Sequence, residues 1–268
     1  MATPTVLISG ASRGLGAATA RTSAQLGANV VLMAWSEDAL VAVAREIETS
    51  GGQVLVVVGD VSHVADCHRA VAEGIQRFGH LDALVNNAGT LAPIAPFADS
   101  DSEAWRKSWA VNVLGPVVLS QAALPYLRLA QGRIVNVSSG AAVHVIPGWA
   151  AYCVSKAALN HLTRALAEEE PSITAIAFRP GIVDTAMQAT IREQGAEGMP
   201  GDAYERFVRY YEEGELLPPE VPACALSVLA LFAPHEWSGL FLPWDHDDLQ
   251  SLVRRFACGA GSRQPRGR

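Results

Sequence analysis

An apolar strand, a glycine-rich turn and a helix open this chain, and the alternation of strand and helix continues along most of its length. Residues 6–9 form a short β-type run, followed at once by G-A-S-R-G-L-G with glycines at positions 10, 14 and 16. A helical pattern follows. Glycine lets the backbone approach a phosphate, and a helix N-terminus offers unpaired N–H groups and partial positive charge. The turn predicts a phosphate-binding site, although an ordinary strand-to-helix turn can have a similar sequence.

Further apolar runs and helical patterns follow with short links. Strands are expected at residues 29–34, 54–58, 81–85, 134–138, 173–178 and 239–242. Helices are expected at residues 37–50, 63–78, 102–129 and 219–232, and a further helix carries Tyr152 and Lys156 and continues to residue 168. This alternation predicts an α/β fold, a single doubly wound Rossmann-type domain over residues 1–256 with about seven parallel strands and helices on both faces.

Three local features refine this prediction. The wholly apolar run 54–58 is expected to be a strand buried on both faces. Ser36 is expected to cap the helix that begins at residue 37. The stretch 102–129 contains Pro116, so we expect a kink or break near that residue.

Polar motifs follow the predicted strands. Asp60 and Val61 follow the third strand, N-N-A-G at 86–89 ends the fourth, Ser139 follows the fifth, and R-P-G-I-V-D-T at 179–185 follows the sixth. Ligands of parallel α/β sheets bind beyond the carboxyl ends of the strands. The positions of these motifs therefore favour a common binding site.

Tyr152 and Lys156 form a Y-x-x-x-K pair in the helix that continues to residue 168. Residues four apart lie on one face of a helix, and a nearby ammonium lowers the pKa of a phenol. A tyrosine in this setting exchanges protons closer to neutral pH, with Ser139 near the same substrate oxygen. The pair taken alone also fits a half-buried tyrosine beside a solvated lysine.

Composition narrows the functional classes. The net charge of −7 argues against a nucleic-acid surface. The four scattered cysteines predict neither a disulfide framework nor a metal site. No signal-type leader is evident, and no apolar run is expected to reach membrane-spanning length. We expect a soluble cytoplasmic protein whose Gly/Pro-rich tail, residues 257–268, is disordered.

The segment 186–219 interrupts the alternation. It carries Met187, Met199 and several aromatic residues among many charges. Long excursions after a strand are often lids or binding loops. We expect a substrate lid here; the alternative is a pair of surface helices whose aromatic side chains pack on the domain.

Together, in this order and spacing, these motifs resemble the short-chain dehydrogenase/reductase family over nearly the whole chain. The resemblance implies hydride transfer between a nicotinamide cofactor and a carbonyl or alcohol. It makes Tyr152 the general acid in reduction, with Lys156 lowering its pKa and holding the nicotinamide ribose. It assigns Ser139, rather than Ser138, to the carbonyl oxygen. Asn112 would shape a kinked helix and a water path for protons.

The same resemblance implies a cofactor site. The residues expected there are Gly10, Ser12, Arg13, Gly14, Leu15, Gly16, Trp35, Ser36, Asp60, Val61, Asn87, Ala88, Gly89, Tyr152, Lys156, Pro180, Gly181, Val183 and Thr185. The glycines would approach the pyrophosphate, Asp60 and Val61 the adenine, and Val183 and Thr185 the carboxamide.

The choice between NADP and NAD depends on the end of the second strand. Family members that prefer NAD tend to carry an acidic residue there, where this chain has Ala34. Arg13 is a cation suited to a 2′-phosphate, and Ser36 adds a hydroxyl. Trp35 stands where NADP users often have arginine, and it could stack on adenine. We expect NADP (NADPH), with NAD less favoured.

The C-terminal third resembles the sepiapterin reductase and benzil reductase-like branch, through R-P-G-I-V-D-T-A-M-Q, L-L-P-P-E-V-P-A and S-G-L-F-L-P-W-D. That branch reduces ketones and vicinal diketones, often aromatic ones. Aromatic and methionine walls suit such a substrate. The expected pocket residues are His144, Val145, Trp149 and Met187, with Leu91 and Trp244 as further walls.

The expected function is an NADPH-dependent carbonyl reductase with a small-molecule substrate. Two alternatives are an NAD-dependent alcohol dehydrogenase of the same family and a non-catalytic NADP-sensing regulator. By analogy with the family, we expect a homodimer or homotetramer that pairs through the helices carrying Asn112 and Tyr152.

Overall fold

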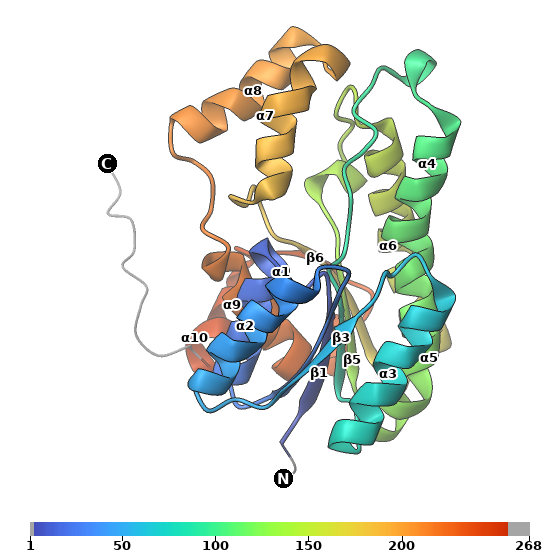
Figure 1. Ribbon diagram of the computed structural model, residues 1–268, viewed down its shortest axis with the longest axis vertical. Helices are drawn as coiled ribbons and strands as arrows, with labels where there is room; N and C mark the ends of the chain where they lie inside the picture. The colour runs from blue at the N-terminus through green and yellow to red at the C-terminus, as the bar shows by residue number, and fades with distance from the viewer. Residues whose placement is uncertain (1–2, 257–268) are drawn as a thin grey trace.

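Seven parallel strands form one sheet in the order β3-β2-β1-β4-β5-β6-β7 (Figure 1). The computed structural model describes residues 3–256, so the predicted tail, 257–268, lies outside the described residues. The strands are β1 (Thr5–Ser9), β2 (Asn29–Ala34), β3 (Val54–Val58), β4 (Ala83–Asn86), β5 (Arg133–Val137), β6 (Thr174–Arg179) and β7 (Phe241–Pro243). The strand order changes direction between β1 and β4. The predicted doubly wound α/β fold is confirmed.

Helices cover both faces of the sheet (Figure 1). One face carries α1 (Gly14–Gln25), α2 (Glu37–Thr49), α9 (Glu220–Phe232) and α10 (Asp247–Phe256), and the other carries α3 (Val64–Phe78), α5 (Gly115–Ala130) and α6 (Ala150–Glu169), with α4 (Ser102–Trp109) leading into α5. Neighbouring residues of β1 point to opposite faces, so Ile8 joins the first apolar cluster and Leu7 the second. The strands are therefore apolar in both directions.

Three details differ from the sequence expectations. β3 is at the edge of the sheet, and four of its five residues are only partly buried, because no strand covers its outer side. Ser36 stands before α2 but its side chain makes no capping hydrogen bond. Helix α10, which the sequence analysis did not foresee, packs on α9 and stacks Phe256 on Phe232 at 4.0 Å between ring centroids.

The expected break in the long helical stretch is a π-helical turn, Ala110–Leu114, between α4 and α5. Pro116 follows it in the first turn of α5, where a missing N–H costs little. By length and composition alone, the helical run Ser102–Ala130 is nevertheless long and apolar enough to cross a membrane, so the expectation that no run reaches that length is wrong. In the fold, Leu119 and Leu127 of this run are fully buried against the sheet.

The segment predicted as a lid forms two helices, α7 (Ala186–Gly198) and α8 (Gly201–Glu212), which stand beyond the carboxyl ends of the strands (Figure 1). A parallel bridge between Val183 and Leu217 joins the two ends of this segment. The Leu217 N–H donates to the Ile182 carbonyl at 2.8 Å, and the Asp184 N–H donates to the Leu217 carbonyl at 2.9 Å. The helix pair is thus held at its base, and its movement as a lid stays a prediction.

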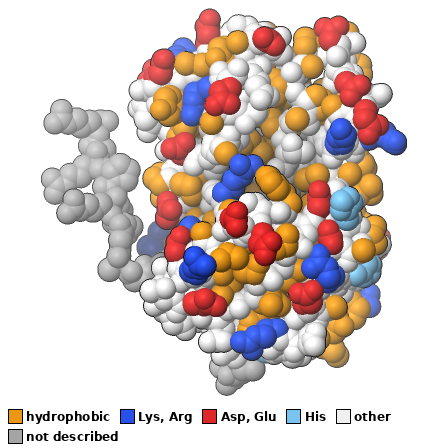
Figure 2. Space-filling view, in the orientation of Figure 1, with side chains coloured by type: hydrophobic (Ala, Val, Ile, Leu, Met, Phe, Trp, Pro, Cys, Tyr) orange, Lys and Arg blue, Asp and Glu red, His pale blue; other side chains and the backbone are white. Residues whose placement is uncertain are grey.

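The face shown in Figure 2 mixes acidic and basic side chains over the helices beside the sheet and over α7 and α8. Apolar side chains lie between the charged ones. Charge of one sign does not gather on this face.

Two leucines of α5 test the assigned core. Leu127 is fully buried, whereas Leu129 is 86% exposed. We expect Leu127→Ala to lower the free energy of unfolding by about 2–5 kcal/mol, because it removes buried methyl groups and leaves a cavity. Leu129→Ala should change it by less than about 0.5 kcal/mol. Urea denaturation measures both, and equal effects would contradict this packing of α5.

Candidate active site

A cleft of about 1170 Å³ opens at the carboxyl ends of the strands. It brings together nearly all residues expected at the site, from the glycine turn, the ends of β2 to β6 and helices α6 and α7. Of the expected cofactor and substrate residues, Ser36 does not line it. Asn112 of the expected catalytic set also lies outside its walls. The cleft lies where the strand order reverses, the usual ligand position in such sheets.

The glycine turn is packed against the end of β4 through Asn87. The Asn87 Nδ2 donates to the carbonyls of Ser9 and Gly10 at 3.0 and 3.1 Å. A Cβ on Gly16 would overlap the Gly10 carbonyl and the Asn87 amide. Gly10 has φ +66°, a conformation that glycine adopts without strain. Only glycine therefore allows α1 to begin this close to the turn.

Ser9 completes this junction. Its hydroxyl accepts hydrogen bonds from the N–H groups of Asn87 and Ala88, both at 3.1 Å. The hydroxyl is thus the part of this side chain that the turn uses. The ends of β1 and β4 are thus fixed to each other by side-chain bonds as well as by the sheet.

The N-terminus of α1 suits a phosphate group. Arg13 precedes the helix in an extended conformation, and no side chain caps the first turn. The first N–H groups of a helix need partners, and anions satisfy them. The residues of the turn therefore fit the pyrophosphate of a dinucleotide, with no side chain competing for the same donors.

Beyond the turn, Arg13, Trp35 and Asp60 line the same end of the cleft. Trp35 is 71% exposed, so it fills no core. Within residues 3–256 Arg13 forms no ion pair. One Asp60 carboxylate oxygen accepts from the Ser62 N–H at 2.8 Å, which fixes the loop after β3. β2 ends in Ala34, so this position carries no acidic side chain that would repel a 2′-phosphate.

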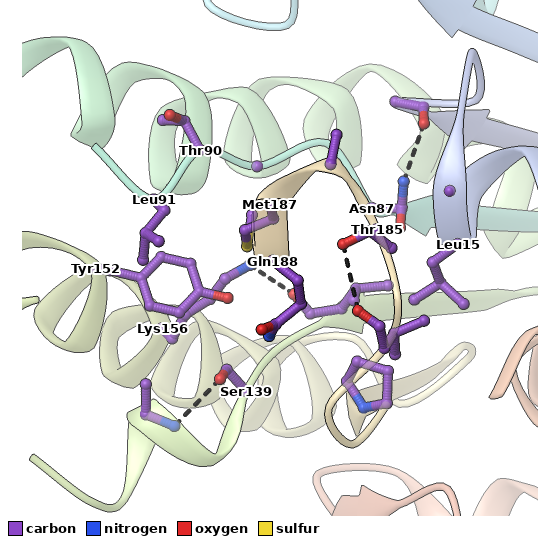
Figure 3. Close-up of a pocket in the computed structure, with 18 of the residues that line it drawn as sticks. Leu15, Asn87, Thr90, Leu91, Ser139, Tyr152, Lys156, Thr185, Met187 and Gln188 are labelled. Carbon is purple, nitrogen blue, oxygen red and sulfur yellow. Dashed lines mark hydrogen bonds between the residues drawn. The ribbon is translucent and has the colours of Figure 1, made fainter. Parts of the chain in front are cut away.

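Tyr152, Lys156 and Ser139 meet in the cleft (Figure 3). Tyr152 and Lys156 lie in the first turns of α6 and are 7% and 4% exposed. The Lys156 ammonium lies 5.6 Å from the centroid of the Tyr152 ring and donates to the Val137 carbonyl at 2.7 Å. The Ser139 hydroxyl accepts from the Ala141 N–H at 3.1 Å, which fixes its position after β5. The arrangement places a phenol, a hydroxyl and a cation around one small space.

Burial dominates the acid–base properties of this pair. It raises the pKa of Tyr152 to about 12, although the Ser139 side chain acts in the opposite direction. It also lowers the pKa of Lys156 to about 8. The prediction that Lys156 would leave Tyr152 with a lowered pKa is therefore wrong for this structure. At neutral pH the phenol holds its proton.

Asn112 lies in the π-helical turn and is fully buried. Its side chain accepts from the Thr90 N–H and donates to the Thr90 carbonyl, both at 2.8 Å. It also donates to the Ser155 hydroxyl of α6 at 3.1 Å. Asn112 thus connects the loop after β4 to α6 and positions Tyr152 and Lys156 indirectly. π-Helical turns often occur at functional sites.

The other half of the cleft has apolar walls. Trp149 is 5% exposed, and its ring lies 4.7 Å from Phe207 of α8 and 5.9 Å from Tyr152, measured between ring centroids. Its Nε1 donates to the Met199 sulfur at 3.2 Å. Trp149 therefore joins α8 to Tyr152. His144 and the 86% exposed Val145 line the cleft without being part of the core.

Sequence reasoning missed several wall residues from α7 and α8. These are Gln188, Ile191, Arg206, Phe207 and Tyr210. The signal available was their place in the segment after β6, but the sequence did not show which side chains turn inward. Among the described residues, no group of three or more His, Cys, Asp or Glu side chains is placed to hold a metal ion.

Residues 4–196 match the short chain dehydrogenase family. The chain belongs to this family. An uncharacterized oxidoreductase of Schizosaccharomyces pombe is 41% identical over 89% of the chain and 95% of its own length. A benzil reductase ((S)-benzoin forming) of Saccharomyces cerevisiae is 38% identical over 91% and 97%.

Two solved structures of dehydrogenases and reductases extend the likeness to the fold. A short chain dehydrogenase/reductase of Saccharomyces cerevisiae superposes with a TM-score of 0.89 at 35% identity, over 93% of this chain and 99% of that one. A variant of an actinorhodin polyketide ketoreductase, whose crystal structure is with NADPH, gives 0.80 at 27% identity, over 91% and 97%. This chain therefore shares its fold with these two proteins over nearly its whole length, including the elements that form the cleft.

The glycine turn provides a test of this short chain dehydrogenase site. Gly16→Ala should weaken dinucleotide binding by roughly tenfold or more, about 1.4 kcal/mol, because the new Cβ pushes α1 away from the turn. Gly201→Ala is the control, since its Cβ would make only an ordinary contact, 3.9 Å from a carboxylate oxygen of Glu205. Quenching of protein fluorescence measures the dissociation constants. Unchanged affinity in Gly16→Ala would contradict the assigned role of the turn.

Proposed function

We propose that this protein is an NADPH-dependent carbonyl reductase that reduces an aromatic ketone or vicinal diketone to the hydroxy compound. The observation that carries the proposal is the buried Tyr152 beside Ser139 and Lys156, in a cleft with aromatic and methionine walls. The similarity to a yeast benzil reductase supports the substrate class, and the ketoreductase solved with NADPH supports the cofactor.

The reaction balances as one diketone, one NADPH and one proton giving one hydroxyketone and NADP⁺. When bound, NADPH would supply the hydride for the carbonyl carbon, and the residues of this chain supply the proton and the binding groups. Tyr152 donates its phenolic proton to the carbonyl oxygen as that oxygen gains charge. Ser139 donates a hydrogen bond to the same oxygen, and Lys156 would hold the nicotinamide ribose.

Reduction and oxidation place different demands on Tyr152. Reduction needs a phenol that donates a proton, whereas alcohol oxidation needs a phenolate that accepts one. Burial raises the pKa of Tyr152 to about 12, so the phenol is the form present at neutral pH. The protonated phenol is the form that the proposed reduction requires.

The direct test is the initial rate of NADPH oxidation with benzil in the wild-type protein and in Tyr152→Phe. The variant keeps the ring that packs on Trp149 but loses the proton donor. We expect kcat to fall about 10²–10⁴-fold with NADPH affinity retained. Tyr211→Phe, at an exposed position of α8, is the control. Full turnover in Tyr152→Phe would remove Tyr152 as the acid, and no turnover of the wild type across a ketone panel would contradict a reductase.

Arg13 is proposed to bind the 2′-phosphate of NADP. Arg13→Ala should weaken NADPH binding by about 10–100-fold, in line with about 1.5–3 kcal/mol for hydrogen bonds to charged groups, and leave NADH nearly unchanged. Arg21→Ala is the matched control, because Arg21 is on α1, the helix that Arg13 precedes, pairs with Glu46 and lies outside the cleft. Equal losses for both dinucleotides in Arg13→Ala would exclude this role.

A homodimer or homotetramer is proposed from the exposed apolar side chains of the helices that carry the site. Trp109, Leu114 and Val154 are 37%, 49% and 47% exposed, on α4, the π-helical turn and α6, which pack on one another. We expect light scattering to give a dimer or tetramer at micromolar concentration. Val154→Glu should shift the mass toward the monomer, and a monomeric wild-type protein would contradict the proposal.

A further inference from the structure

The carboxamide of Gln188 is buried in the cleft without a partner. Gln188 lies in the first turn of α7 and is 8% exposed, and its Oε1 has no hydrogen bond. Figure 3 shows its side chain pointing into the cleft, toward the space beside Tyr152 and Ser139. A buried polar atom without a partner carries a desolvation penalty that a bound ligand removes.

Gln188 is a polar residue among apolar wall residues of the cleft. The neighbouring walls are apolar side chains, namely Leu91, Trp149, Met187, Ile191 and Phe207. Among the described residues that line the cleft, the other unpaired buried side-chain atom is the Ser138 hydroxyl, which lies on the strand side next to Ser139. Gln188 comes instead from α7. The strand side and the α7 side of the cleft therefore each hold one buried side-chain oxygen without a partner.

A ligand with two oxygens on adjacent carbons matches this arrangement. Tyr152 and Ser139 take the oxygen of the carbonyl being reduced, which leaves the second oxygen to face α7. A carboxamide offers one acceptor and two N–H donors. Its Oε1 accepts from the hydroxyl of a hydroxyketone, and a half-turn of the amide presents an N–H to a second carbonyl. Gln188 is thus able to pair with both the diketone and the hydroxyketone.

We propose that Gln188 binds the second oxygen of a vicinal diketone and makes this enzyme prefer 1,2-diketones to monoketones of the same shape. The inference rests on the proposed reductase function and names the substrate feature that its cleft recognises. A site built to hydrogen-bond a substrate group discriminates against an analogue that lacks the group, because its own polar atoms are then left unpaired. Gln188 is in this sense a specificity residue.

Benzil and deoxybenzoin test the proposal, because they differ in one carbonyl that is replaced by a methylene. The diketone is intrinsically more reactive, so the informative quantity is the change in the ratio of their kcat/KM values on mutation. In Gln188→Met, which keeps the length of the side chain, the benzil-to-deoxybenzoin ratio should fall about tenfold, as expected for one lost hydrogen bond. The dissociation constant for NADPH should stay within about twofold, since Gln188 is assigned to substrate.

Gln194→Met is the matched control. It makes the same change on α7 at an exposed position outside the cleft, and it should keep the wild-type ratio. Gln188→Glu, a second variant that keeps an acceptor but loses the N–H donors, should also lose benzil preference at neutral pH.

The outcomes distinguish the role of Gln188 from the proposed reductase function. A wild-type enzyme that reduces benzil, with an unchanged ratio in Gln188→Met, would overturn the role of Gln188 and leave the reductase intact. A selective loss of NADPH affinity in Gln188→Met would also overturn it, by moving the side chain to the cofactor. A wild-type protein that reduces no ketone would overturn both. A reduced ratio with wild-type NADPH affinity supports the proposal.

Discussion

The contact between the glycine turn and Asn87 is the constraint on which the cleft depends. The Asn87 amide bonds to the carbonyls of Ser9 and Gly10, and Gly16 leaves room for this contact because it has no Cβ. Through it, the loops that follow β1 and β4 are fixed at the point where the sheet changes direction. The uncapped N-terminus of α1 is then presented to the cleft as a phosphate site.

Burial governs the chemistry at the centre of the cleft. The Tyr152 phenol and the Lys156 ammonium are both removed from water, which disfavours the charged form of each. The result is a tyrosine that keeps its proton and a lysine that gives up its own more readily than in water. Asn112 and the π-helical turn hold α6 against the loop after β4, so this geometry is set by buried hydrogen bonds rather than by exposed charges.

The substrate half of the cleft is built from segments far apart in the chain. Trp149, before α6, packs on Phe207 of α8 and bonds to Met199. A Cβ on Gly148 would overlap the Gly198 carbonyl, and one on Gly198 would overlap the Ile94 carbonyl, so the end of α7 meets two loops backbone to backbone. The position of α7, and with it Gln188, follows from this junction.

The sequence by itself determined the alternation of strands and helices, the glycine turn and the Tyr152–Lys156 spacing, because these depend on local periodicity and on residues within one or two turns. It did not determine that β3 is an edge strand, that Tyr152 keeps a raised pKa, or that Gln188 faces the cleft unpaired. Strand order, solvent exclusion and the inward side of α7 depend on contacts between residues distant in the sequence. Only the packed tertiary structure decides them, because burial is a property of all the surrounding elements together.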